Sequence, residues 1–161
     1  IQNDSLRTLE DLIRQNHHEN EHGMILKMDV EGAEWGFLSV VSPEILKQFD
    51  QMTFEFHNIT NPDNPELVLK SLRNINRTHQ LIHIHPNNFA ETITVGGKKF
   101  TRQIEVSYAS REKYNFSEDC DIILPIKADS RDCHFIPEIE LGRWNDNSGS
   151  FDRASINIMD L

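Results

Sequence analysis

The repeated order of a strand-like apolar segment followed by polar residues constrains the fold more than any other feature. Residues 24–28 form a short apolar run interrupted only by Lys27, residues 52–57 alternate between apolar and polar side chains, and residues 81–85 are again strand-like. Helical spacing of apolar residues separates these segments. This order predicts an α/β fold with an open sheet whose first strands are parallel.

The remaining elements are predicted from caps and turn residues. Thr8 caps a first helix that ends near residue 16, residues 42–44 open a short helix, and Asn64 followed by Pro65 begins another. Residues 91–108 surround Gly96-Gly97 and predict a closing antiparallel hairpin with residues 103–108 as its long, buried arm. The run 24–28 predicts a strand that is buried on both faces.

Two parts of the chain differ in composition. Residues 1–110 carry the regular pattern and are predicted to form the domain, whereas the chain beyond Asn115 is irregular and rich in Asp, Asn and Pro. We therefore expect residues 111–161 to be an extension that packs on the domain, mostly as coil.

Charge and hydropathy limit the class of partner. The 161 residues include 16 Lys and Arg against 26 Asp and Glu, a net charge of -10. This balance disfavours nucleic acid, because phosphate binding needs clustered basic residues. No stretch approaches the roughly 20 apolar residues of a membrane span, and the first residues lack the apolar core of a signal peptide. We expect a cytoplasmic protein with Cys120 and Cys133 reduced; three N-x-S/T patterns, at Asn58, Asn76 and Asn115, leave a secretory location open.

Residues 18–22 read HENEH and formally match the H-E-x-x-H zinc motif. A metalloprotease needs this motif inside a buried helix, yet here it precedes Gly23 and a strand. We interpret it as a solvated loop.

Polar side chains recur where the three predicted strands end. Asp29 and Glu31 follow the first strand, His57 and Asn58 the second, and the third is followed by His85, Asn87 and Asn88. Ligands of open α/β sheets bind beyond the carboxyl ends of the strands. These residues therefore form a candidate site, although loops are polar in any protein.

The segment 29–34, DVEGAE, is the most specific part of this candidate site. Asp29 and Glu31 bracket the strand-to-helix turn, where backbone N–H groups stabilise negative charge. Such carboxylates can hold an ammonium group, a sugar hydroxyl or a metal ion. Glu34 falls in the first turn of the next helix, where we expect a capping role.

The glutamates and histidines of the strands allow two interpretations. Buried charges need partners, so a structural network across the sheet explains Glu55, His83 and Glu105. His57 and His85 lie nearest the strand ends, and a neutral imidazole there can take a proton from a hydroxyl. Alternatively, Asp29, His57 and His85 bind a divalent cation.

Several segments in order resemble one known family. They are TLEDL at 8–12, ILKMDVEGAEW at 25–35, FEFH at 54–57, HIHPNN at 83–88 and EVSY at 105–108, with LGRWN at 141–145. The series resembles the FkbM family of S-adenosylmethionine-dependent methyltransferases. It implies the C-terminal half of a Rossmann-like class I methyltransferase sheet, with strand 24–28 as the fourth of seven, and methyl transfer to a hydroxyl of a sugar or natural product.

The resemblance also implies roles for the strand-end residues. Asp29 and Glu31 would face the methyl donor and the acceptor, and either Asp29 or His57 would remove the acceptor proton. The acceptor side would be lined by further polar residues: Glu31, His57, His85, Asn87 and Asn88.

The chain departs from the family before residue 24. Class I enzymes cradle the donor with a glycine-rich turn after the first strand, and nothing before Met24 supplies that turn. We therefore expect three N-terminal strands to be missing, weak binding of S-adenosylmethionine, and an exposed edge at strand 24–28 that the missing half or a second copy would cover. A non-catalytic remnant that binds a glycan or a partner is the alternative function.

Overall fold

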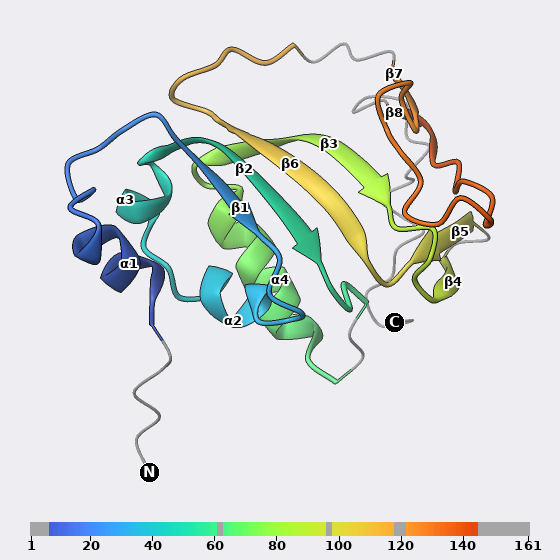
Figure 1. Ribbon diagram of the computed structural model, residues 1–161, viewed down its shortest axis with the longest axis horizontal. Coiled ribbons are helices and arrows are strands. Elements are labelled where there is room, and N and C mark those ends of the chain that lie inside the picture. Colours follow the sequence, from blue (N-terminus) through green and yellow to red (C-terminus); the bar gives the residue numbers. More distant parts are fainter. Residues whose placement is uncertain (1–6, 61–62, 96–97, 118–121, 145–161) are drawn as a thin grey trace.

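The computed structural model describes residues 7–60, 63–95, 98–117 and 122–144 (Figure 1). Cys120 and the last 17 residues of the predicted extension, 145–161, lie outside these ranges. The helices are α1 (Leu9–Gln15), α2 (Glu34–Leu38), α3 (Pro43–Leu46) and α4 (Pro65–Ile75). The strands are β1 (Met24–Met28), β2 (Phe49–Phe56), β3 (His79–Pro86), β4 (Thr92–Val95), β5 (Lys98–Thr101), β6 (Ile104–Ser110), β7 (Ile122–Leu124) and β8 (Gly142–Trp144).

A four-stranded mixed sheet in the order β1-β2-β6-β3 forms the centre of the fold. β1 and β2 are parallel, and β6 runs antiparallel to both of its neighbours. The strands β1, β2 and β3 therefore point the same way, as the sequence predicted for the start of an α/β sheet.

The predicted closing hairpin is partly wrong. β4 and β5 do pair as an antiparallel hairpin, but they form a separate two-stranded sheet. The segment predicted as its long arm is instead β6, which leaves the hairpin and inserts between β2 and β3. Its buried Ile104, Val106 and Tyr108 explain the insertion, because a central strand buries more apolar area than a hairpin arm.

The helices lie on one face of the four-stranded sheet (Figure 1). Met52, Phe54 and Phe56 alternate along β2 and are almost completely buried, as the period of two predicted. Short side chain–backbone bonds join α2 to α4: Ser71 Oγ donates to the Trp35 carbonyl at 2.8 Å, and Asn74 Nδ2 donates to the Leu38 carbonyl at 2.8 Å. These contacts hold both ends of α2 against α4.

β1 is not buried on both faces, so that prediction was wrong. The side chain of Ile25 is 71% exposed, and Lys27 is also exposed. β1 lies at the edge of the sheet, and within the described residues the helices cover only one of its faces. Its outer edge has no described strand paired with it.

The predicted helix starts are confirmed by their caps. Thr8 and Asp11 form a reciprocal capping box at α1, Ser42 Oγ accepts from the Ile45 N–H at α3, and the side chain of Asn64 caps α4. Residues 18–22 are exposed and not helical, which agrees with the interpretation of a solvated loop. Among the described helices the longest has 11 residues, and none is long and apolar enough to cross a bilayer.

The described part of the extension packs beside the end of β3. It carries the small antiparallel sheet of β7 and β8 and reaches Asn88, whose side-chain amide donates to the carbonyls of Cys133 and Ile136, both at 2.9 Å. The Asn88 Oδ1 atom accepts from the Cys133 N–H at 2.9 Å. One buried asparagine thus holds both ends of this loop.

Candidate functional site

The turn between β1 and α2 begins the site. Glu31 and Gly32 both have left-handed backbone conformations, with φ of 54° and 101°. Glycine adopts this region without strain, but for glutamate it costs on the order of 1 kcal/mol. The strained turn leads directly into the first residue of α2, Glu34, and the side chain of Glu34 folds back to accept from the Val30 N–H at 3.0 Å.

His57 follows the last residue of β2 and is held from two sides. The Trp35 indole N–H donates to its backbone carbonyl at 2.7 Å, and its ring Nδ1 lies 3.1 Å from Glu34 Oε1. Because an ionised carboxylate only accepts, Nδ1 carries the hydrogen and donates to Glu34. Both His57 and Glu34 are buried, so this pair is shielded from solvent.

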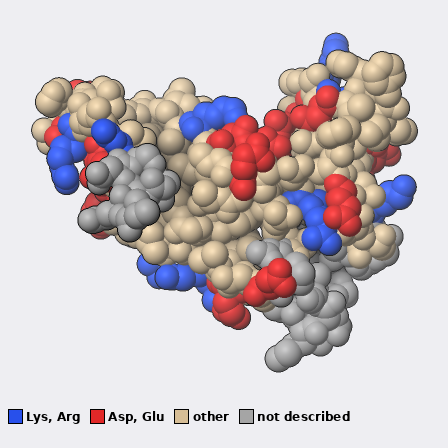
Figure 2. Space-filling view, turned by 60° about the horizontal axis from the view of Figure 1, so that its bottom comes forward, with Lys and Arg blue, Asp and Glu red and all other residues tan. Residues whose placement is uncertain are grey.

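The second ring nitrogen of His57 faces further carboxylates. Nε2 lies 3.3 Å from Glu31 Oε2 and 4.0 Å from Asp29 Oδ1. The Lys27 ammonium lies 3.8 Å from the other oxygen of Asp29. Figure 2 shows acidic side chains gathered beside the hollow between the two lobes of the surface. The predicted residues Asp29, Glu31 and His57 are therefore brought together.

Glu55 joins this group from β2. Its carboxylate, the Asp29 carboxylate and a His57 ring nitrogen place their ligand atoms within 4.8 Å of one another. Burial raises the pKa of Glu55, and the Asp29 charge adds to that effect, whereas a hydrogen bond from Asn87 opposes it. Asn87 Nδ2 donates to Glu55 Oε1 at 3.2 Å. We refer to Asp29, Glu31, Glu34, Glu55 and His57 as the His57 cluster.

His85 does not belong to the His57 cluster, so the predicted cation site of Asp29, His57 and His85 is wrong. Its Nδ1 lies 3.1 Å from Glu105 Oε2, and its Nε2 lies 3.3 Å from Glu138 Oε1. The physical reason is β6: its insertion between β2 and β3 places Glu105 opposite both Glu55 and His85. His85 is thereby paired across the sheet and covered by the extension.

The electrostatics of His85 follow from this pairing. Burial by itself would lower its pKa, but the hydrogen bond with Glu105 and the charges of Asp129 and Glu138 outweigh burial and raise it. A similar pair lies two residues earlier on β3, where His83 Nε2 is 2.8 Å from Asp129 Oδ1. The predicted network of Glu55, His83 and Glu105 does not form as such: Glu105 pairs with His85, whereas Glu55 bonds Asn87 and His83 bonds Asp129 of the extension.

The two asparagines predicted to bind substrate have structural partners. Asn87 bonds Glu55 with its amide, and its Oδ1 accepts from the Phe89 and Ala90 N–H groups at 2.9 and 3.2 Å. Asn88 is buried and bonded to the extension, as described above. Only Asn87 touches the His57 cluster.

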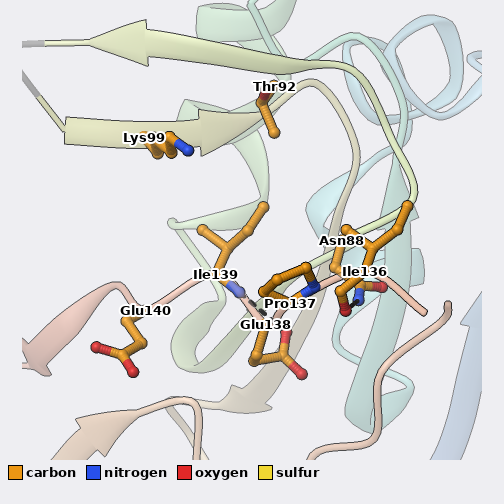
Figure 3. Close-up of a pocket in the computed structure, with 8 residues that line it drawn as sticks. All are labelled: Asn88, Thr92, Lys99, Ile136, Pro137, Glu138, Ile139 and Glu140. Atoms are coloured by element: carbon orange, nitrogen blue, oxygen red, sulfur yellow. Dashed lines mark hydrogen bonds between the residues drawn. The ribbon is translucent and has the colours of Figure 1, made fainter. Parts of the chain in front are cut away.

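A separate pocket lies between the extension and the β4–β5 hairpin (Figure 3). It has a volume of about 380 Å³ and is lined by Asn88, Thr92, Lys99, Ile136, Pro137, Glu138, Ile139 and Glu140. None of these residues belongs to the His57 cluster. The pocket therefore adjoins His85, through Glu138, and not the His57 cluster.

Sequence reasoning missed two members of the site. Glu34 was expected only to cap the helix; it does accept from a turn N–H, but it also orients His57. Glu55 was assigned to a structural network. The signal for Glu55 was its position two residues before His57, since alternate residues of a strand share a face. For Glu34 the sequence offered no such signal, because its burial depends on the tertiary structure.

Asp29 and Glu31 stand at a strand end, as the resemblance implies, but the described residues before β1 contain no strand and no glycine-rich turn that would cradle an adenosyl group. No protein-family model, curated protein or solved structure matches this chain.

Proposed function

We propose that this chain carries the acceptor side of an S-adenosylmethionine-dependent O-methyltransferase that acts on a hydroxyl of a sugar or natural product. The observation that carries the proposal is the buried Glu34–His57 pair at the carboxyl ends of parallel strands. S-adenosylmethionine would supply the methyl group. The parallel pair of β1 and β2 agrees with the parallel strands that the resemblance to the FkbM family implies, although the antiparallel strand β6 lies inside the sheet.

The residues of the cluster suit a hydroxyl that must lose a proton. Glu34 accepts the Nδ1 hydrogen and so leaves the lone pair on Nε2. Nε2 points toward Asp29 and Glu31 at the protein surface, where a hydroxyl can be bound by the carboxylates and transfer its proton to Nε2 or to the Asp29 carboxylate. Such proton transfer contributes typically 10²–10⁴-fold in rate.

The test is a methyl-transfer assay on the full-length protein with radiolabelled donor and a panel of mono- and oligosaccharides. His57→Ala and Asp29→Ala are compared with wild type, and donor binding is measured separately. His83→Gln is the matched control, because His83 also pairs with a carboxylate but lies outside the cluster.

We expect a loss of at least about 100-fold in turnover for His57→Ala, with donor binding retained and the control unchanged. Unchanged turnover in both alanine variants would contradict the proposal. Saturable sugar binding without any transfer would instead support a non-catalytic binding module.

A further inference from the structure

Both ring nitrogens of His57 face carboxylates. Nδ1 is 3.1 Å from Glu34, and Nε2 is 3.3 Å from Glu31 and 4.0 Å from Asp29. A neutral imidazole has one N–H, and Glu34 takes it. The lone pair of Nε2 is then directed at negatively charged oxygens, an arrangement that favours a cation between them.

The spacing of the surrounding atoms suits a metal ion. One nitrogen of His57 and one oxygen each from Asp29 and Glu55 lie within 4.8 Å of one another. Ligands bonded at about 2.1 Å to one ion lie at most about 4.2 Å apart. Small side-chain rotations therefore close the three groups on one ion.

Glu34 provides an independent observation. It is fully buried, and its Oε2 has no hydrogen-bond partner among the described residues. An unpartnered buried carboxylate oxygen is costly unless positive charge lies nearby. Glu34 stands behind His57 in the position of the outer carboxylate that orients and polarises a metal-bound histidine.

The excess negative charge of the His57 cluster also favours a bound cation. The cluster places four carboxylates around one imidazole, and the described cation beside it is Lys27, whose side chain is 67% exposed. An exposed ammonium contributes little to such a site because it remains solvated. A divalent ion would offset the excess negative charge.

We infer that Asp29, Glu55 and His57 bind a divalent transition-metal ion such as Mn²⁺ or Zn²⁺, with Glu34 as the residue that positions the histidine. One imidazole and two carboxylates form a ligand set that these ions accept. The inference stands on the geometry and does not rest on the proposed methyl transfer. With the ion bound, Nε2 would be a ligand and not a proton acceptor, and a hydroxyl on the ion would have a lowered pKa.

The experiment is a titration of the whole chain with Mn²⁺, in which the electron paramagnetic resonance signal of the free ion measures how much of it remains unbound. The variants Asp29→Asn and Glu55→Gln keep side-chain shape and remove one ligand charge each; both residues are at least partly exposed, so the fold should survive. His83→Gln is the control. Circular dichroism checks the fold of each variant.

We expect one saturable Mn²⁺ site, weakened roughly tenfold or more by each ligand variant, and unchanged in the control. Glu34→Gln should weaken it by about 10–100-fold, the usual effect of removing an outer carboxylate. The absence of saturable binding by folded wild-type protein, or binding that both ligand variants retain, would overturn the inference. Because neither donor nor acceptor is added, failure here leaves the methyl-transfer proposal to its own assay.

Discussion

Glu34 and His57 are 23 residues apart in the chain, yet Glu34 Oε1 lies 3.1 Å from His57 Nδ1 in the buried layer between α2 and β2. Glu34 lies just after the strained β1–α2 turn, and His57 directly follows the last residue of β2. The pair joins the first two strand ends of the sheet. It also determines which ring nitrogen of His57 faces Asp29 and Glu31.

The strain at Glu31 predicts that replacing it with glycine increases stability. Glu31→Gly removes the cost of a left-handed glutamate, and the side chain is 84% exposed, so little packing is lost. The free energy of unfolding in urea should rise by about 1 kcal/mol. Glu44→Gly is the control: it replaces a glutamate of ordinary helical backbone in α3 and should destabilise. A fall in the stability of Glu31→Gly would contradict the argument from strain.

The pairing of His85 predicts a specific pH dependence. Its pKa is raised above 6.5 in the folded protein, so the stability that its charged form contributes is present below pH 6.5 and is lost as pH rises through the folded pKa. The stability difference between wild type and His85→Gln should therefore shrink between pH 5.5 and 8.

His79 serves as the internal control for that measurement. Burial lowers its pKa below 6.5, which makes the folded state prefer the neutral ring. The stability difference between wild type and His79→Gln should consequently grow from pH 5.5 to 8. Equal trends for the two histidines would contradict the assignment.

The hydrogen bonds of Asn88 predict that this residue attaches the extension to the segment after β3. Asn88→Ala removes three hydrogen bonds to Cys133 and Ile136. Since buried groups would lose their partners, stability should fall by about 1–3 kcal/mol. Amide exchange at Cys133 should accelerate, whereas Asn115→Ala, at an exposed position, should leave that amide unchanged. Unaltered exchange in Asn88→Ala would show that other contacts hold the loop.

The site predicts weak affinity of this chain for the methyl donor. The described residues supply strand-end carboxylates but no turn that could cradle an adenosyl group. Calorimetry with S-adenosylmethionine should show no binding in the micromolar range. Micromolar affinity would mean that donor contacts arise elsewhere in the chain.

The fold was predictable where local signals and burial agree. Thr8, Ser42 and Asn64 mark helix starts because their side chains bond the first free N–H groups, and the alternation of Met52, Phe54 and Phe56 fixes the inner face of β2. The position of β6 was not predictable. A strand that follows a hairpin in the chain can pair with several other strands, and only tertiary packing selects the position between β2 and β3.

The candidate site was predicted in part. Asp29, Glu31 and His57 lie together because parallel strands end at the same edge. His85 was misplaced because its distance from His57 depends on the inserted strand, and the partners Asp129 and Glu138 come from an irregular extension without periodicity. Glu34 was assigned only a capping role, since burial of a first-turn carboxylate depends on the partner it finds.

We propose above all that Glu34 holds the hydrogen of His57 on Nδ1, so that the lone pair of Nε2 is free to react. The most direct measurement is the turnover of methyl transfer by Glu34→Gln in the full-length protein at saturating donor, with the acceptor KM and the folded fraction determined alongside. The account predicts that kcat falls at least about tenfold while the acceptor KM and the folded fraction change little. A kcat equal to that of wild type in a folded Glu34→Gln protein would contradict it.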